Sequence, residues 1–150
     1  MYMQSIILEE YIMPFFNRKH ELALLDDIFQ RPNGDLFVLY GRRRVGKTVL
    51  LNHWLAARRH RALFWTADQT SAASQIRAFS QTLQKFKNPN QALPPDFTYG
   101  TWEIALTELA GLAERERFVT VLDEFTYLIE SDPTVPSVLQ RLWDHRLKQT

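Results

Sequence analysis

Apolar residues recur along this chain at two different spacings, and the two spacings predict two kinds of element. Short continuous apolar runs predict strands that are covered on both faces; they are residues 36–40, 62–66 and 118–122. Apolar positions three and four residues apart predict amphipathic helices; these are residues 16–30, 47–60, 72–87 and 101–116, with a last helix that begins near Pro136. The prolines and asparagines of residues 87–100 predict a loop.

Strands that alternate with helices pair in parallel, because each helix returns the chain to the starting edge of the sheet by a right-handed crossover. We therefore predict an α/β sandwich with a mainly parallel sheet. At 150 residues the chain fits one domain with enough apolar material for a core.

The segment YGRRRVGKTVL, residues 40–50, joins the first predicted strand to the following helix. Its residues 41–48 fit the phosphate-loop pattern G-x-x-x-x-G-K-[ST] in the strand-and-helix setting that this pattern requires. Gly41 and Gly46 let the backbone approach a phosphate chain, and the helix N-terminus directs free amides at it. Lys47 offers an ammonium to the β- and γ-oxygens, and the Thr48 hydroxyl suits Mg²⁺. The sequence therefore predicts a nucleotide phosphate site.

The arginines inside this loop have two interpretations. Their side chains either add positive potential beside the phosphates or contact a partner, or they point into solvent, which is the simpler interpretation for any one of them. The predicted binding segment includes five further positions: Arg42, Arg43, Arg44, Val45 and Val49.

Two carboxylates follow the third predicted strand in FVTVLDE, residues 118–124. Ligands of open α/β sheets bind at the carboxyl edge of the strands, where the phosphate loop also lies. Asp123 is suited to hold Mg²⁺ through its water shell, and Glu124 to orient and deprotonate an attacking water. On its own the pair could equally be two acidic residues at a strand end, and the phosphate loop favours the catalytic interpretation.

Composition narrows the classes of function further. The net charge of +1 favours no particular partner, and without cysteine there is no disulfide framework, thiol nucleophile or cysteine zinc site. The four histidines lack the spacing of a metal site. The apolar N-terminal residues lack the features of a signal peptide, and no segment approaches the roughly 20 apolar residues of a membrane span. We expect a cytoplasmic protein without a membrane partner.

With both motifs located, the chain resembles the archaeal-type ATPases, a prokaryotic family of P-loop proteins near the STAND and AAA+ NTPases. The resemblance runs from Phe15 onward through FNRKHELALL, YGRRRVGKT and FVTVLDEF to LQRLWD. It implies a three-layer α/β/α sandwich that binds ATP with Mg²⁺ and hydrolyses it. Residues 41–48 become the Walker A loop, Asp123 the Walker B aspartate and Glu124 the catalytic glutamate.

The resemblance also places the opening segment near the nucleotide base, which makes Phe16, Asn17 and Arg18 candidate base neighbours. It implies that residues 1–12 are an N-terminal extension and that residues 13–150 are the N-terminal part of an ATPase domain. In relatives a sensor-bearing strand lies between the phosphate-loop strand and the Asp-Glu strand, and a further C-terminal region follows. Buried unpaired backbone groups cost about 1–3 kcal/mol each, so we expect a chain without that strand to fold poorly, to close up, or to recruit a partner strand.

Four functions therefore stay open. The first is an ATPase, and the second is a nucleotide-binding interaction module with little turnover. A small-molecule or nucleotide kinase is opposed by Glu124 directly after Asp123 and by the lack of an arginine-rich lid. Nucleic-acid binding would use the short basic run at residues 58–61, which is more typical of a solvated helix end. Other protein subunits are open as partners, and nucleic acid also through a region beyond this chain.

Overall fold

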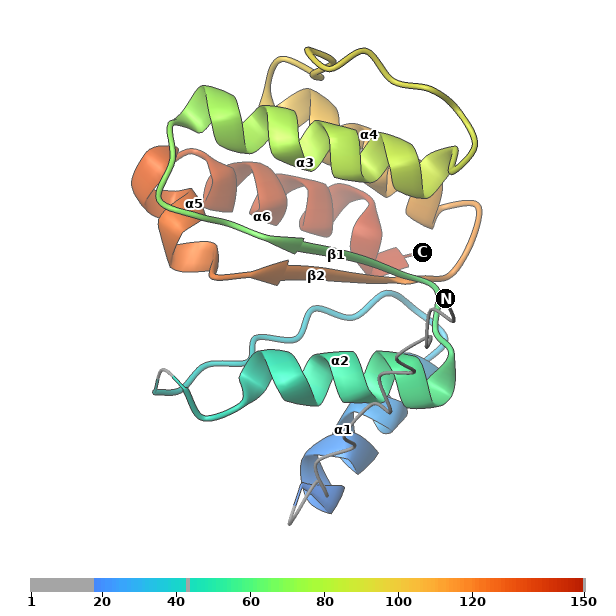
Figure 1. Ribbon diagram of the computed structural model, residues 1–150. Helices are drawn as coiled ribbons and strands as arrows, with labels where there is room; N and C mark the ends of the chain where they lie inside the picture. Colours follow the sequence, from blue (N-terminus) through green and yellow to red (C-terminus); the bar gives the residue numbers. More distant parts are fainter. Residues whose placement is uncertain (1–17, 43, 150) are drawn as a thin grey trace, which may run out of the picture.

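The computed structural model describes residues 18–42 and 44–149. The predictions for residues 1–12, Phe16, Asn17 and Arg43 lie outside these ranges. In chain order the elements are α1 (Lys19–Gln30), α2 (Lys47–Arg58), β1 (Ala62–Thr66), α3 (Ala72–Lys87), α4 (Trp102–Ala113), β2 (Val119–Asp123), α5 (Phe125–Ser131), α6 (Val135–His145) and the 3-10 helix η1 (Leu147–Gln149) (Figure 1).

Local signals set the helix ends. Ser71 and Thr101 cap α3 and α4, since their hydroxyls accept hydrogen bonds from the amides of Ser74 and Ile104, each 3.2 Å long. Pro136 stands in the first turn of α6, where the missing amide proton costs nothing. The predicted helices therefore form close to the expected residues. The short helix α5 was not predicted.

Within the described residues the sheet has two parallel strands, β1 and β2, as their alternation with helices predicts. Their register pairs Ala62 with Val119 and Thr66 with Asp123. Asp123 therefore ends its strand beside the last residue of β1, at the carboxyl edge of the sheet. The main-chain oxygen of Asp123 also accepts a hydrogen bond of 3.0 Å from the amide of Ala67.

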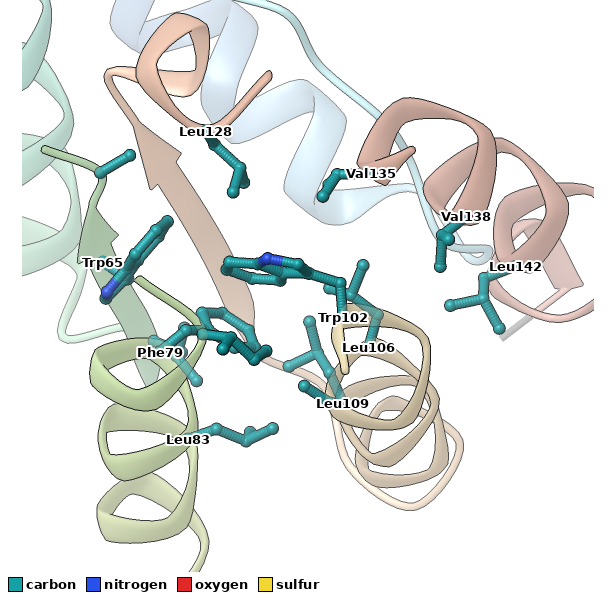
Figure 2. Close-up of a cluster of buried hydrophobic side chains, with 14 residues drawn as sticks. Trp65, Phe79, Leu83, Trp102, Leu106, Leu109, Leu128, Val135, Val138 and Leu142 are labelled. Carbon is teal, nitrogen blue, oxygen red and sulfur yellow. The ribbon is translucent and has the colours of Figure 1, made fainter. Parts of the chain in front are cut away.

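Helices cover both faces of this sheet (Figure 1). On one face α3, α4, α5 and α6 enclose the larger core, in which the rings of Trp65, Phe79 and Trp102 meet (Figure 2). The ring centroids of Phe79 and Trp102 are 5.0 Å apart. On the other face α1 and α2 pack a smaller core against the sheet, with Leu50 and Trp54 buried. The predicted α/β class is confirmed, while a complete three-layer sandwich stays a prediction.

The predicted strand at residues 36–40 is wrong. This segment is irregular: Leu39 packs on the smaller core, whereas Leu36, Phe37, Val38 and Tyr40 are 63%, 40%, 69% and 88% exposed. A strand is defined by a hydrogen-bonded neighbour, and in the described part of the chain β2 pairs only with β1. The apolar run is therefore present without the partner that would make it a strand.

Candidate active site

The loop at residues 41–48 leads from this irregular segment into α2. Three of its described residues have positive φ: Gly41 at 152°, Arg44 at 63° and Gly46 at 79°. Gly46 is the N-cap of α2, and its carbonyl accepts the first helical hydrogen bond from Leu50 at 2.9 Å. Side chains are strained at these φ values, so glycine suits two of the positions. The loop therefore delivers the free amides and positive dipole end of α2 to the carboxyl edge of the sheet.

The ammonium group of Lys47 folds back onto the loop. Its Nζ donates hydrogen bonds of 3.0 Å to the carbonyl oxygens of both Gly41 and Arg42. An ammonium has three protons, so these bonds fix its position and leave one proton for a ligand oxygen. The ammonium of Lys47 is thus fixed against the loop backbone, where its positive charge can also bind an anion.

A side-chain hydrogen bond joins the loop to the end of β2. The Thr48 hydroxyl donates to Oδ2 of Asp123 at 2.7 Å, across 75 positions of sequence. These are the two residues predicted as metal ligands, and the fold places their oxygens in contact. The contact brings the start of α2 to the carboxyl edge of the sheet, where β2 ends.

Glu124 directly follows this contact in a tight turn. Its amide donates to Oδ1 of Asp123 at 2.9 Å, and its carbonyl accepts from the amide of Tyr127 at 2.9 Å. Its φ of 52° and ψ of 39° lie in the left-handed region, which is uncommon for a residue with a side chain. The exposed carboxylate therefore emerges from a constrained backbone next to Asp123.

The other predicted site residues lie around the loop. Arg42 and Arg44 are exposed, in line with the solvated interpretation, and Val45 and Val49 are 40% and 59% exposed. Arg18 lies at the start of α1, and its Nη2 donates to the carbonyl oxygen of Val45 at 2.5 Å. Arg18 therefore contacts the loop backbone, a contact that the sequence did not predict.

A second unpredicted residue is Gln75 of α3, which is 1% exposed. Its Nε2 donates to the carbonyl of Tyr127 at 3.2 Å and to the hydroxyl of Ser131 at 2.8 Å. These bonds anchor α5, the helix that begins directly after Glu124. The available signal was a glutamine one position before the apolar face of α3, since a buried polar side chain requires partners.

Arg58, His60 and Arg61 of the basic run at the end of α2 make internal contacts. Arg58 Nη2 pairs with Asp26 Oδ2 at 2.6 Å, and Arg61 pairs with Glu116. The ring of His60 lies against that of Phe29, with centroids 3.8 Å apart. These contacts agree with the interpretation of the run as a helix end.

Among the described residues there is neither a preformed metal site nor a membrane-spanning helix. No group of three or more histidine, aspartate or glutamate side chains in residues 18–42 and 44–149 is placed to hold a metal ion. A metal at the Thr48–Asp123 pair would therefore need ligand oxygens from elsewhere, as Mg²⁺ takes from phosphates and water. None of the helices in the same ranges is long and apolar enough to cross a membrane.

Helices on both faces of a parallel sheet, with a glycine loop and a hydroxyl–carboxylate contact at its carboxyl edge, are compatible with the class of α/β ATPase domains. Comparison with known proteins gives the family. Residues 15–150 match the ATPase domain found predominantly in Archaea, and the chain belongs to this family. The predicted resemblance to archaeal-type ATPases is confirmed.

Two relatives come from Methanocaldococcus jannaschii. One is an uncharacterized protein that is 30% identical over 138 residues, which are 91% of this chain and 27% of the relative. The other is an uncharacterized ATP-binding protein that is 48% identical over 44 residues, which are 29% of this chain and 75% of the relative. The chain thus spans about a quarter of the length of the first relative. No solved structure matches it.

Proposed function

We propose that this chain binds ATP together with Mg²⁺ through residues 41–49 and hydrolyses it with the help of Asp123 and Glu124. We further propose a three-layer P-loop fold of the AAA+ or STAND type, with residues 13–150 as the N-terminal part of the ATPase domain. The observation that carries the functional proposal is the 2.7 Å contact between Thr48 and Asp123, which unites two motifs 75 residues apart. The name of the second relative, an ATP-binding protein, supports the same ligand.

Phosphate binding would use the loop backbone and Lys47. The free amides at the start of α2 would bind phosphate oxygens near Gly46, where the positive end of the helix dipole favours an anion. The remaining ammonium proton of Lys47 would bind a phosphate oxygen. Arg42 and Arg44 are exposed beside the loop and would add positive potential.

The donor set near Asp123 fits a hard cation. Hydroxyl and carboxylate oxygens are the ligands that Mg²⁺ prefers, and this ion typically uses one or two protein oxygens plus phosphates and water. Thr48 would be the direct ligand, and Asp123 would act through coordinated water. The ion would supply charge neutralisation at the phosphate oxygens.

Glu124 would act as the general base. Its carboxylate would accept a proton from a water whose oxygen attacks the γ-phosphorus, while the bond from that phosphorus to the β–γ bridging oxygen breaks and ADP leaves. The backbone turn at Glu124 and the Gln75 contacts to α5 would hold this carboxylate in place.

A second candidate, nucleotide binding with little turnover, has its own support. Residues 36–40 enter the loop without a paired strand in the described part of the chain. A loop anchored firmly only on its helix side would position phosphates less rigidly, and catalysis is more sensitive than binding to such misplacement.

The test uses two variants and two matched controls. Lys47→Ala should weaken Mg²⁺-ATP binding about 10–100-fold, as the loss of a charge-assisted hydrogen bond implies. Glu124→Gln should keep binding and lose about 10²–10⁴ of the hydrolysis rate. Lys85→Ala and Glu130→Gln, at exposed positions outside the site, should change neither.

The measurements are thermal stabilisation by Mg²⁺-ATP and release of phosphate. Binding without turnover in the parent protein would favour the second candidate. Transfer of phosphate to an added acceptor instead of water would identify a kinase. Equal binding by the parent and Lys47→Ala would refute the assigned phosphate site.

A further inference from the structure

The side chain of Arg18 connects the start of α1 to the loop at residues 41–48. Its Nη2 donates to the carbonyl oxygen of Val45 at 2.5 Å, and its Nη1 donates to Oε1 of Glu21 at 3.2 Å. These two bonds hold both terminal nitrogens of the guanidinium, and the side chain of Arg18 is 32% exposed. Arg18, at the beginning of α1, thus donates a hydrogen bond to a main-chain carbonyl 27 positions further along the chain.

The Val45 carbonyl that accepts this bond belongs to the same peptide group as the amide of Gly46. A peptide group is planar, and in the trans form its C=O and N–H point in opposite directions. The described residues contain no cis peptide bond. A guanidinium that pulls the Val45 carbonyl toward α1 therefore turns the Gly46 N–H away from α1, at the N-terminal end of α2.

Gly46 leaves the orientation of this peptide group weakly fixed by the backbone itself. Gly46 has a φ of 79°, and a residue without a side chain reaches both signs of φ with similar ease. The 45–46 peptide can therefore rotate at little cost, and a rotated peptide would present its carbonyl oxygen, instead of its N–H, to an anion. The Arg18 bond opposes this rotation.

We propose that Arg18 is a positioning residue that holds the 45–46 peptide with the Gly46 amide directed at bound phosphate. The proposal rests on the proposed phosphate site and differs from the base-neighbour role that the family resemblance implies. Glu21 supports the same geometry, since its carboxylate fixes the other arm of the guanidinium.

The two roles predict different ligand dependence. A residue that orients a phosphate-binding amide affects every ligand that carries the same phosphates, with or without a base. Arg18→Ala should therefore lower the affinity for ATP, GTP and inorganic tripolyphosphate by the same factor, about tenfold for the loss of one charge-assisted hydrogen bond. The affinity of Arg18→Lys should lie between those of Arg18→Ala and the parent, because lysine keeps the charge but lacks the planar guanidinium that can contact two acceptors.

Calorimetric titration of the three ligands in the presence of Mg²⁺ provides the main test. Arg31→Ala is the matched control: Arg31 directly follows α1 and pairs with Asp27 and Asp35, and it forms no ion pair with the described residues of the loop. It should bind all three ligands as the parent does. A second readout is the ¹⁵N-labelled Gly46 amide without ligand, whose resonance and hydrogen exchange should change in Arg18→Ala and not in Arg31→Ala.

The outcomes separate this proposal from the proposed function. If the parent binds tripolyphosphate and Arg18→Ala binds it equally well, or if only the preference between ATP and GTP changes, the positioning role is refuted. If the parent binds none of the ligands and Lys47→Ala behaves identically, the phosphate site itself is refuted, whatever the Gly46 amide shows. If circular dichroism shows that Arg18→Ala is unfolded, Arg18→Lys becomes the test variant. The proposal is overturned if Arg18→Lys binds with the affinity of the parent and its Gly46 amide is unchanged.

Discussion

Glu124 and Arg59 are two residues with side chains that adopt nearly the same left-handed backbone conformation. Their φ and ψ angles are 52° and 39° for Glu124 and 52° and 35° for Arg59. A left-handed residue with a Cβ costs roughly 1–2 kcal/mol. Glycine removes this strain but loses about 0.5–1 kcal/mol more conformational entropy on folding. We therefore expect Glu124→Gly to be more stable than Glu124→Ala by about 0.5–1 kcal/mol.

The comparison with alanine isolates the backbone, because both variants lack the carboxylate and only glycine relieves the strain. Arg59 ends α2 far from the loop, so Arg59→Gly should exceed Arg59→Ala in stability by a similar amount. Both Glu124 variants should lose hydrolysis, whereas both Arg59 variants should keep it. Such a result would mean that the turn at Glu124 trades folding stability for the placement of its carboxylate.

The assay is urea unfolding followed by circular dichroism, with phosphate release measured on the same samples. The expected result is a higher midpoint for each glycine variant than for its alanine counterpart, with an unchanged slope. Equal midpoints at Glu124, combined with a clear difference at Arg59, would refute the strain argument at the site. Full hydrolysis by Glu124→Ala would refute the role of the carboxylate instead.

Two further predictions concern stability and solubility. Burial lowers the pKa of His60 below its ordinary value near 6.5. The unfolded chain therefore binds a proton more readily than the folded protein, and the free energy of unfolding should fall as pH drops through about 6.5. His60→Gln should reduce the pH dependence of this free energy between pH 7 and 5 in urea unfolding, and an unchanged pH dependence would contradict this. Leu36 and Val38 are 63% and 69% exposed on an unpaired segment, so replacing both with lysine should reduce self-association measured by light scattering. Equal scattering by parent and variant would show that this segment does not drive association.

Local patterns in the sequence were enough to locate most elements and the candidate chemistry. The spacing of apolar residues predicted α2, α3 and α4 nearly to their ends, because each helix depends mainly on its own residues and caps. The two motifs predicted that Thr48 and Asp123 would lie together, and the structure places their side chains in contact. The roles assigned to Lys47, Thr48, Asp123 and Glu124 stay predictions.

Other features depended on contacts between distant segments. Residues 36–40 have the composition of a buried strand, but a strand also requires a hydrogen-bonded neighbour, and composition does not supply one. The bond from Arg18 to the Val45 carbonyl depends on how α1 packs beside α2, and no side-chain pattern marks a main-chain acceptor. Gln75 became an anchor for α5 only once α3 lay against that helix.

The sequence by itself therefore determined most of the helices, the three candidate strands and the two motifs of the candidate site. The tertiary structure decided which apolar run became a strand and which polar groups hold the loop and the Glu124 turn. The physical reason is that periodicity and capping are properties of neighbouring residues, whereas hydrogen bonds between segments form only after packing has brought their donors and acceptors together.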